Sequence, residues 1–168
     1  MKSFSQMDRG SRQRIDVTEG IESSLVMLTH KLKQGIEVVR DYGPVPEVEA
    51  YAGELNQVWA NLVDNACDAM TESMTGSAGA GTLRISTRAD GGHVVVELAD
   101  TGPGMPDDVA ARAFEPFFTT KEVGKGTGLG LDIARRIVEE RHRGSIHIDS
   151  RPGDTVVTVR LPVRQPTF

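Results

Sequence analysis

The sequence lacks the features expected of a secreted or membrane-embedded protein. Cys67 is the single cysteine among 168 residues, so the chain cannot form an internal disulfide framework, which fits a reducing compartment. No apolar run is long enough to span a bilayer, and the N-terminus has no apolar core of the signal-peptide kind. We therefore expect a cytoplasmic protein and no membrane contact from this segment.

Basic patches and metal-binding patterns are also scarce. The net charge is −5, which argues against a general nucleic-acid surface. The four histidines (His30, His93, His142 and His147) have no zinc-ligand spacing with Cys67. The Gly-Lys-Ser/Thr ending of a Walker loop and a G-x-S-x-G elbow are both absent. These absences leave the glycine-rich stretches of the second half as the most informative feature.

Length and hydrophobic periodicity indicate one α+β domain. We predict helices at about 16–30, 54–74, 107–113 and 127–142, and strands at 36–42, 82–87, 93–98, 145–150 and 155–161. Because helices are mixed with antiparallel hairpins, we expect a two-layer sandwich. Its mixed, mostly antiparallel sheet would be covered on one face by about three helices.

The ends of the domain follow from the same pattern. We expect it to occupy residues 15–163, before a tail over 164–168. Residues 1–14 are expected to be a flexible lead-in or the end of an upstream segment. Asp16 is expected to cap the first helix, and Gly144 to end the last one in the manner of a C-cap.

The predicted helix at 54–74 has two contrasting sides. Its apolar stripe consists of Leu55, Val58, Trp59, Leu62, Val63, Ala66 and Met70. The opposite arc carries Gln57, Asn61, Asp64, Asn65 and Asp68. Asn61 and Asn65 lie one turn apart, and their amide oxygens are hard ligands suited to a Mg²⁺ ion that also binds phosphates. The alternative interpretation is a solvated helix face, which is the usual place for Asn and Asp.

A carboxylate and two glycines follow a predicted buried strand. Asp100 ends that strand and precedes Thr-Gly-Pro-Gly, with Gly102 and Gly104 where the backbone cannot carry bulk. A carboxylate in this place can accept a hydrogen bond from the exocyclic amine of adenine. The alternative is a local Asx-turn, for which the same four residues are well suited.

Four glycines at every second position lead into the last predicted helix. Gly124, Gly126, Gly128 and Gly130 resemble a phosphate cradle, because free backbone N–H groups and a helix N-terminus favour an anion. The alternative is a flexible linker.

The segment before the glycines follows three phenylalanines, Phe114, Phe117 and Phe118, which we interpret as core residues. Residues 119–125 could close over phosphates as a nucleotide lid. Lys121 and Lys125 are candidates for phosphate contacts or are exposed loop lysines.

Four ordered motifs resemble those of the sensor histidine kinases. They are the N box at 61–66 (NLVDNA), the first glycine box at 100–105 (DTGPGM), the F box at 114–121 (FEPFFTTK) and the second glycine box at 126–131 (GTGLGL). The closing strand at 153–162 is similar too, although Asp154 stands where that pattern usually has glycine. The resemblance covers roughly 16–163 and extends to gyrase-type topoisomerases, heat-shock chaperone ATPases and mismatch-repair ATPases.

The resemblance implies an ATP-binding fold with ATP and Mg²⁺ as ligands. Asn61 and Asn65 would serve Mg²⁺ and phosphates, and Asp100 would read the adenine amino group. The implied nucleotide-binding residues are Asn61, Asn65, Asp68, Asp100, Gly102, Gly104, Met105, Phe117, Lys121, Lys125, Gly126, Thr127, Gly128, Leu129, Gly130 and Thr155. No residue is assigned as catalytic.

One position favours kinases over fast ATPases. The chaperone and topoisomerase ATPases have a glutamate one turn before the N-box asparagine, where it is the general base for water. This sequence has Asn61 there. The resemblance therefore implies the catalytic domain of a histidine protein kinase, which transfers the γ-phosphoryl group of ATP to a histidine.

The histidine-bearing box of that family is absent from this sequence. His30 is followed by Lys31 and lacks an acidic partner, so it does not fit a phosphoacceptor. We expect the acceptor on a separate dimerisation segment, in the same full-length protein or in another, with a response regulator as an indirect partner. The isolated domain is expected to be a monomer. Alternative functions are a non-catalytic ATP-binding switch, an anti-sigma-type serine protein kinase and a stand-alone ATPase.

Overall fold

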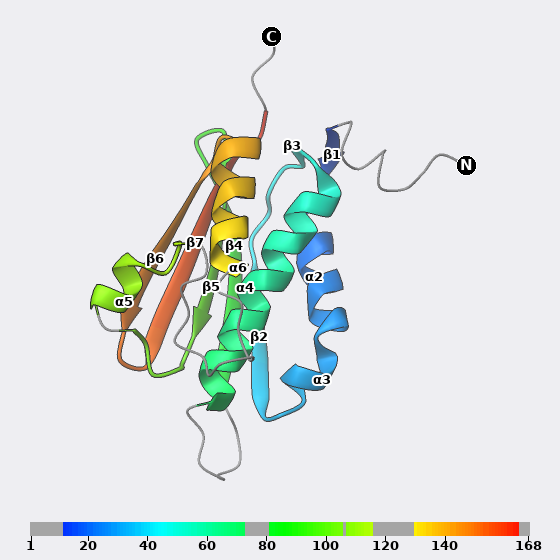
Figure 1. Ribbon diagram of the computed structural model, residues 1–168. Helices are drawn as coiled ribbons and strands as arrows, with labels where there is room; N and C mark the ends of the chain where they lie inside the picture. Colours follow the sequence, from blue (N-terminus) through cyan, green and yellow to red (C-terminus); the bar gives the residue numbers. More distant parts are fainter. Residues whose placement is uncertain (1–11, 73–80, 106, 116–129, 165–168) are drawn as a thin grey trace.

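The computed structural model describes residues 12–72, 81–105, 107–115 and 130–164. The elements in chain order are β1 (Gln13–Ile15), α2 (Val17–Met27), α3 (Thr29–Leu32), β2 (Ile36–Tyr42), β3 (Val48–Ala50), α4 (Ala52–Glu72), β4 (Gly81–Asp90), β5 (His93–Asp100), α5 (Asp107–Ala111), α6 (Gly130–Arg135), the π-helix η1 (Arg136–Arg141), β6 (Ser145–Arg151) and β7 (Asp154–Pro162). Helices α2 and α4, with α6 continuing into η1, lie side by side over one face of the sheet (Figure 1). The predicted α+β sandwich is confirmed.

The main sheet has five strands in the order β2-β4-β5-β7-β6. Strands β2 and β4 are parallel because α4 carries the chain between them, and the other three pairs are antiparallel. A two-residue turn joins β4 to β5, and its residues Gly91 and Gly92 have φ of 55° and 81°. Two positive φ values in succession are typical of a type I′ turn, which matches the twist of the flanking strands. Both predicted hairpins are therefore confirmed.

The core lies between the sheet and helix α4. All seven predicted apolar residues of α4 are buried, and Trp59 and Val63 are fully so. Ile21 and Leu25 of α2 pack against the same cluster, as do Leu83 and the other inward side chains of the central strands. In the part of the chain that the structure describes, no helix is both long and apolar enough to cross a membrane.

The first predicted helix is divided in two. Asp16 caps α2 as expected, and its carboxylate accepts a hydrogen bond from the backbone N–H of Thr18 at 2.9 Å. The helix ends at Met27 instead of continuing to 30, and α3 starts after Leu28. The hydroxyl of Thr29 donates to the carbonyl of Val26 at 2.6 Å, so a side chain satisfies a carbonyl at the helix end.

A second, two-stranded sheet was not predicted. Strand β1 pairs antiparallel with β3, with Gln13 opposite Ala50. Strand β1 starts at Gln13, two residues before the expected start of the domain at residue 15. Segments of three residues are too short for hydrophobic alternation to reveal them.

The last helix changes its geometry halfway. Residues 127–129 of the prediction lie outside the described residues, and α6 passes into the π-helix η1, where a single α-helix was predicted. The fully buried ring of His142 ends it: Nδ1 lies 2.8 Å from the carbonyl oxygen of Ile137, and Nε2 accepts from the N–H of Tyr51 at 3.0 Å. Burial lowers the pKa of His142, so its neutral form ties this helix to the start of α4.

Gly144 closes the helix for a different reason from the one expected. The residue with positive φ is Arg143, at 60°, and not Gly144. A Cβ on Gly144 would instead lie 2.1 Å from the carbonyl oxygen of Arg160 on β7. Glycine is required at 144 because the helix end contacts backbone.

Replacing Gly144 should therefore destabilise the domain. We expect Gly144→Ala to lower the free energy of unfolding by about 1–3 kcal/mol, since the added methyl group meets an immobile carbonyl. Gly91→Asn is the control, because Gly91 faces open space and asparagine suits its turn. Urea unfolding of both variants checks this, and equal stability of Gly144→Ala and the wild type would contradict it.

Candidate functional site

Two of the predicted motifs meet on the polar side of α4. The side-chain amide of Asn61 donates from Nδ2 to the carbonyl oxygen of Gly130 at 3.1 Å. A Cβ placed on Gly130 would lie 3.5 Å from Nδ2 of Asn65, so the first residue of α6 passes closely over both asparagines. The structure therefore brings the N box and the end of the second glycine box together, 65 or more residues apart in the sequence.

The carboxylate of Asp100 lies at the end of β5, only 7% exposed. Its Oδ1 accepts a hydrogen bond from the backbone N–H of Gly102 at 2.9 Å, which is the Asx-turn considered as the local alternative. Among the described residues this bond uses one oxygen, and Oδ2 can still accept from a ligand. The turn and a binding role are therefore compatible.

The ionised form of the Asp100 carboxyl group is electrostatically unfavourable in this environment. Burial raises the pKa of its carboxyl group, the N–H of Gly102 acts in the opposite direction, and the charge of Asp154 raises it further. Among the described residues Asp100 has no cationic partner, and a buried carboxylate of this kind is typical of a functional position.

The glycines beside Asp100 allow close contacts. A Cβ on Gly102 would lie 2.9 Å from Oδ1 of Asp100 and 3.4 Å from Ala69 of α4. Gly104 has φ of 81°, and its Cβ would lie 2.4 Å from the carbonyl oxygen of Arg151. Both positions exclude any side chain, so the first glycine box packs directly against α4 and β6.

A small polar network continues from Gly104 to the last strand. The backbone N–H of Met105 donates to Oγ of Ser150 at 2.8 Å, and this hydroxyl lies 2.8 Å from that of Thr155. Thr155 is 8% exposed and stands opposite Asp100 in the β5–β7 register. Sequence analysis missed Ser150; the predicted hairpin around Pro152 and Gly153 was the available signal, because its register sets Ser150 opposite Thr155.

Asp68, also in the predicted set, belongs to an ion-pair cluster. Its Oδ1 lies 3.0 Å from Nζ of Lys31, and the same ammonium group contacts the carboxylate of Asp64. Burial lowers the pKa of Lys31, but hydrogen bonds to the two carboxylates outweigh this and raise it above its ordinary value. Sequence analysis did not single out Lys31 as part of the site.

The other predicted residues cannot be placed. Phe117, Lys121, Lys125, Gly126, Thr127, Gly128 and Leu129 lie outside the described residues. The same holds for the proposed lid at 119–125. The described half of the site comprises Asn61, Asn65, Asp68, Asp100, Gly102, Gly104, Met105, Gly130 and Thr155.

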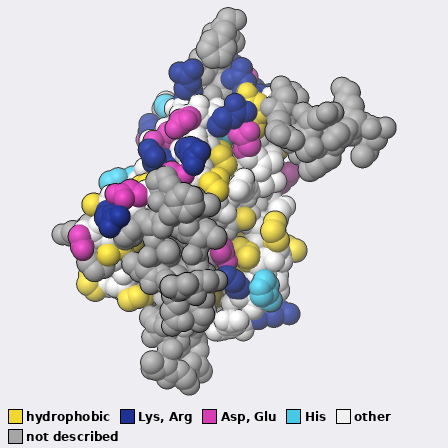
Figure 2. All heavy atoms as spheres, viewed as in Figure 1, with side chains coloured by type: hydrophobic (Ala, Val, Ile, Leu, Met, Phe, Trp, Pro, Cys, Tyr) yellow, Lys and Arg dark blue, Asp and Glu magenta, His cyan; other side chains and the backbone are white. Residues whose placement is uncertain are grey.

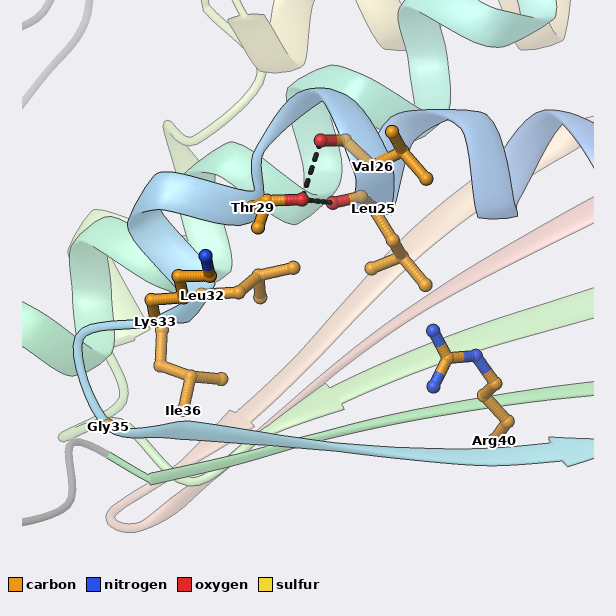
Figure 3. A pocket seen from close by; sticks show the side chains of 8 residues that line it. All are labelled: Leu25, Val26, Thr29, Leu32, Lys33, Gly35, Ile36 and Arg40. Atoms are coloured by element: carbon orange, nitrogen blue, oxygen red, sulfur yellow. Dashed lines mark hydrogen bonds between the residues drawn. The ribbon is translucent and has the colours of Figure 1, made fainter.

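A groove of about 460 Å³ lies elsewhere, between α2, α3 and the edge strand β2 (Figure 3). Leu25, Leu32 and Ile36 contribute apolar side chains to it, and Lys33 and Arg40 lie at its sides. It contains no residue of the predicted set. We assign the site to the polar side of α4, because the buried carboxylate, the paired amides and the close glycine contacts all lie along it.

Charges of both signs alternate on the face formed by η1 and the start of α4. Figure 2 shows basic and acidic side chains interleaved there, in agreement with the ion pairs of Arg135 with Glu139 and of Arg141 with Glu54. Arg141 also lies over the ring of Tyr51, 4.4 Å from its centroid. The Arg141–Glu54 pair connects η1 to α4, and the face as a whole is not of one sign.

The geometry agrees with what comparisons with known proteins show. Residues 51–165 match the family model described as histidine kinase-, DNA gyrase B- and HSP90-like ATPase. Sensor kinase CckA of Brucella abortus (strain 2308) is 36% identical over 170 residues, which cover 95% of this chain and 18% of CckA.

Solved structures agree with the family match. The catalytic domain of histidine kinase ThkA is 30% identical, with a TM-score of 0.79 over 92% of this chain and 97% of that one. ThkA in complex with the response regulator TrrA matches with 28% identity and a TM-score of 0.74, over 90% and 42% of the two chains. Full-length ShkA in complex with AMPPNP is 27% identical, with a TM-score of 0.77 over 94% and 32%.

The family match covers more than half of the chain and includes every described residue of the site. The chain spans less than a fifth of the length of CckA. It belongs to the family of histidine kinase-, DNA gyrase B- and HSP90-like ATPases, and its fold is that of the catalytic domains of sensor histidine kinases.

Proposed function

We propose that this chain is the ATP- and Mg²⁺-binding catalytic part of a protein histidine kinase. It holds ATP while the γ-phosphoryl group passes to a histidine nitrogen on a separate dimerisation segment. In that step the bond between the γ-phosphorus and its bridging oxygen breaks, a P–N bond forms, and ADP leaves. We take the domain to occupy residues 15–163, preceded by the first two residues of strand β1.

The observation that carries the proposal is the arrangement of both ends of the site along α4. Ala69 packs against Gly102 beside Asp100, and Asn61 bonds to Gly130 at the other end. Eight residues of helix separate these contacts, about 12 Å along the axis. An extended nucleotide laid along α4 would have its adenine at Asp100 and its phosphates at the asparagines.

The adenine end provides a directional acceptor. Oδ2 of Asp100 can accept a hydrogen bond from the exocyclic amine of adenine. Gly102 and Gly104 have no side chains, so a flat ring can approach their backbone. Thr155 lies beside Asp100 in the neighbouring strand and can supply a hydroxyl at the same place.

The asparagines fit a hydrated metal ion. Because a carbonyl oxygen can only accept, Asn61 must turn its amide nitrogen to Gly130, and its Oδ1 is then left for a ligand. Asn65 follows one turn later, and amide oxygens are ligands that Mg²⁺ accepts along with phosphates and water. The ion, when bound, neutralises charge on the phosphates; the two side chains orient it.

The same asparagine argues against rapid hydrolysis. A general base must take a proton from water, and a neutral amide at 61 cannot do so. The acceptor is a histidine outside this chain; His30 is exposed on α3, next to Lys31. A response regulator would be an indirect partner through that histidine.

Replacing Asn65 should separate metal-dependent binding from folding. We expect Asn65→Ala to weaken the affinity for MgATP by at least about tenfold, since a metal ligand is lost. Asn56→Ala is the matched control on the same helix, because Asn56 is exposed on the opposite side. Calorimetric titration measures both, and equal affinity in Asn65→Ala would remove the metal role.

Removing the charge of Asp100 should have opposite effects on binding and stability. Asn can keep the bond to Gly102, but it loses a charged hydrogen bond to adenine worth roughly 1.5–3 kcal/mol. ATP affinity should therefore fall, with Asp41→Asn on the exposed edge of β2 as control. ATP and GTP binding equally well to the wild type would contradict the assignment.

The stability effect follows from the pKa. Burial raises the pKa of Asp100 above its ordinary value of 3.8, so its contribution to stability is full below that value and is lost as the pH rises through the folded-state pKa. We expect nucleotide-free Asp100→Asn to equal or exceed the wild type in stability at neutral pH. The advantage should shrink as the pH falls towards about 4. Urea unfolding of both proteins between about pH 7 and about pH 4 measures this difference in stability. A stability advantage of Asp100→Asn that grows as the pH falls would be inconsistent with the raised pKa.

Phosphoryl transfer can be tested with a fused acceptor. We expect the domain joined to a two-helix histidine segment of a sensor kinase to form acid-labile phosphate from MgATP, while Asn65→Ala in the same fusion forms little. Acid-stable phosphate would indicate a serine kinase instead. MgATP binding without transfer to any of several such segments would favour a non-catalytic switch.

A further inference from the structure

Lys31 makes two ion pairs that connect α3 to the polar side of α4. Its ammonium group lies 3.0 Å from Oδ1 of Asp68 and also contacts Oδ1 of Asp64. The side chain of Lys31 is 30% exposed and that of Asp68 is 19% exposed, so the cluster is partly shielded from water. Partial shielding makes such pairs stronger than those on an open surface.

The two carboxylates lie next to the proposed phosphate site. On a helix, residues three or four apart are neighbours. Asp64 is therefore adjacent to Asn61, Asp68 is adjacent to Asn65, and the two aspartates follow each other by one turn. A polyphosphate bound through the asparagines would have two carboxylates beside it.

This arrangement poses an electrostatic problem. Like charges at a few ångströms repel each other by about 1 kcal/mol in water and more where water is partly excluded. Lys31 pairs with both carboxylates. Two other described cations lie elsewhere: Lys33 lines the groove of Figure 3, and Arg141 pairs with Glu54 at the opposite end of α4.

We infer that Lys31 is a positioning residue for the triphosphate: it holds Asp64 and Asp68 towards α3 and offsets their charge, which lets an anionic ligand approach Asn61 and Asn65. The inference rests on the proposed function, since it deepens the account of the same site. It assigns α3 an electrostatic part in nucleotide binding, in addition to its packing.

The test compares ligands that differ only in their phosphates. Lys31→Met should weaken binding of ATP by about five- to tenfold at low ionic strength, while adenosine binding stays unchanged. The ATP deficit should shrink in 0.5 M NaCl, because salt screens the exposed carboxylates. Lys33→Met is the matched control: it lies two residues away and has no ion pair among the residues that the structure describes.

Removing the carboxylates should make Lys31 dispensable. The triple variant Lys31→Met with Asp64→Asn and Asp68→Asn should recover ATP affinity to within about twofold of the wild type, because no charge is left to offset. Asp64→Asn with Asp68→Asn alone should bind ATP more tightly than the wild type, because in this inference Asp68 stands beside the phosphates and repels them and does not contact the ligand as an acceptor. This double variant keeps the test decisive if Lys31→Met does not fold.

Three outcomes would overturn the inference. They are unchanged ATP affinity in Lys31→Met, an equal loss for ATP and adenosine, and a triple variant as weak as Lys31→Met. The last two would indicate that Lys31 only tethers α3 to α4. Failure of the wild type itself to bind MgATP would instead overturn the proposed function, so the two failures are distinguishable.

Discussion

The structure depends on the orientation of helix α4, which is fixed by its buried side. Trp59, Leu62 and Val63 lie within the core against the sheet and α2, so the helix cannot rotate about its axis without exposing them. Successive residues point about 100° apart, and a slip of one residue would turn the polar side away from Gly130. The geometry of the site is thus a consequence of core packing. Asn61 and Asn65 need few contacts of their own to be held in place.

Much of the fold could be predicted because its signals are local and periodic. The seven apolar positions of α4, the Gly91–Gly92 turn and the Pro152–Gly153 turn are each encoded within a few residues. The division at Leu28 and the π-helix after Arg135 were not predicted: the first accompanies a side-chain hydrogen bond from Thr29 to the carbonyl of Val26, and the second depends on a contact between distant segments. The second is anchored by His142, whose ring bonds to Tyr51, 91 residues earlier.

The same helix buries an aspartate that its pattern did not reveal. Asp132 is 1% exposed, and its Oδ2 accepts from Nε of Arg136 at 3.1 Å. A carboxylate normally lies on the exposed side of a helix. A cationic partner four residues later neutralises its charge and allows it to be buried. Helix propensity and hydrophobic pattern predicted this helix. The ion pair with Arg136 is what allows the side that carries Asp132 to be buried.

The described part of the site was predictable where a motif contains its own geometry. Asp100 and Gly102 form their Asx-turn locally, and the sequence indicated both this turn and the acceptor role, which are compatible because the turn uses one carboxylate oxygen. Ser150 and Lys31 reach the site from other elements, by strand register and by the packing of α3 on α4. The predicted hairpin around Pro152 and Gly153 could have indicated Ser150, but no pattern within a single segment could have revealed Lys31.

The side chain at position 61 determines whether this site can activate water or only bind a metal ion and phosphates. An amide can donate to the carbonyl of Gly130 and offer an oxygen to a metal ion at the same time. A carboxylate there could accept a proton from water, but it could not donate to that carbonyl while ionised. Asparagine therefore favours holding the triphosphate over activating water next to it. For the proposed transfer to a histidine, that preference protects the phosphoryl group from water until the acceptor arrives.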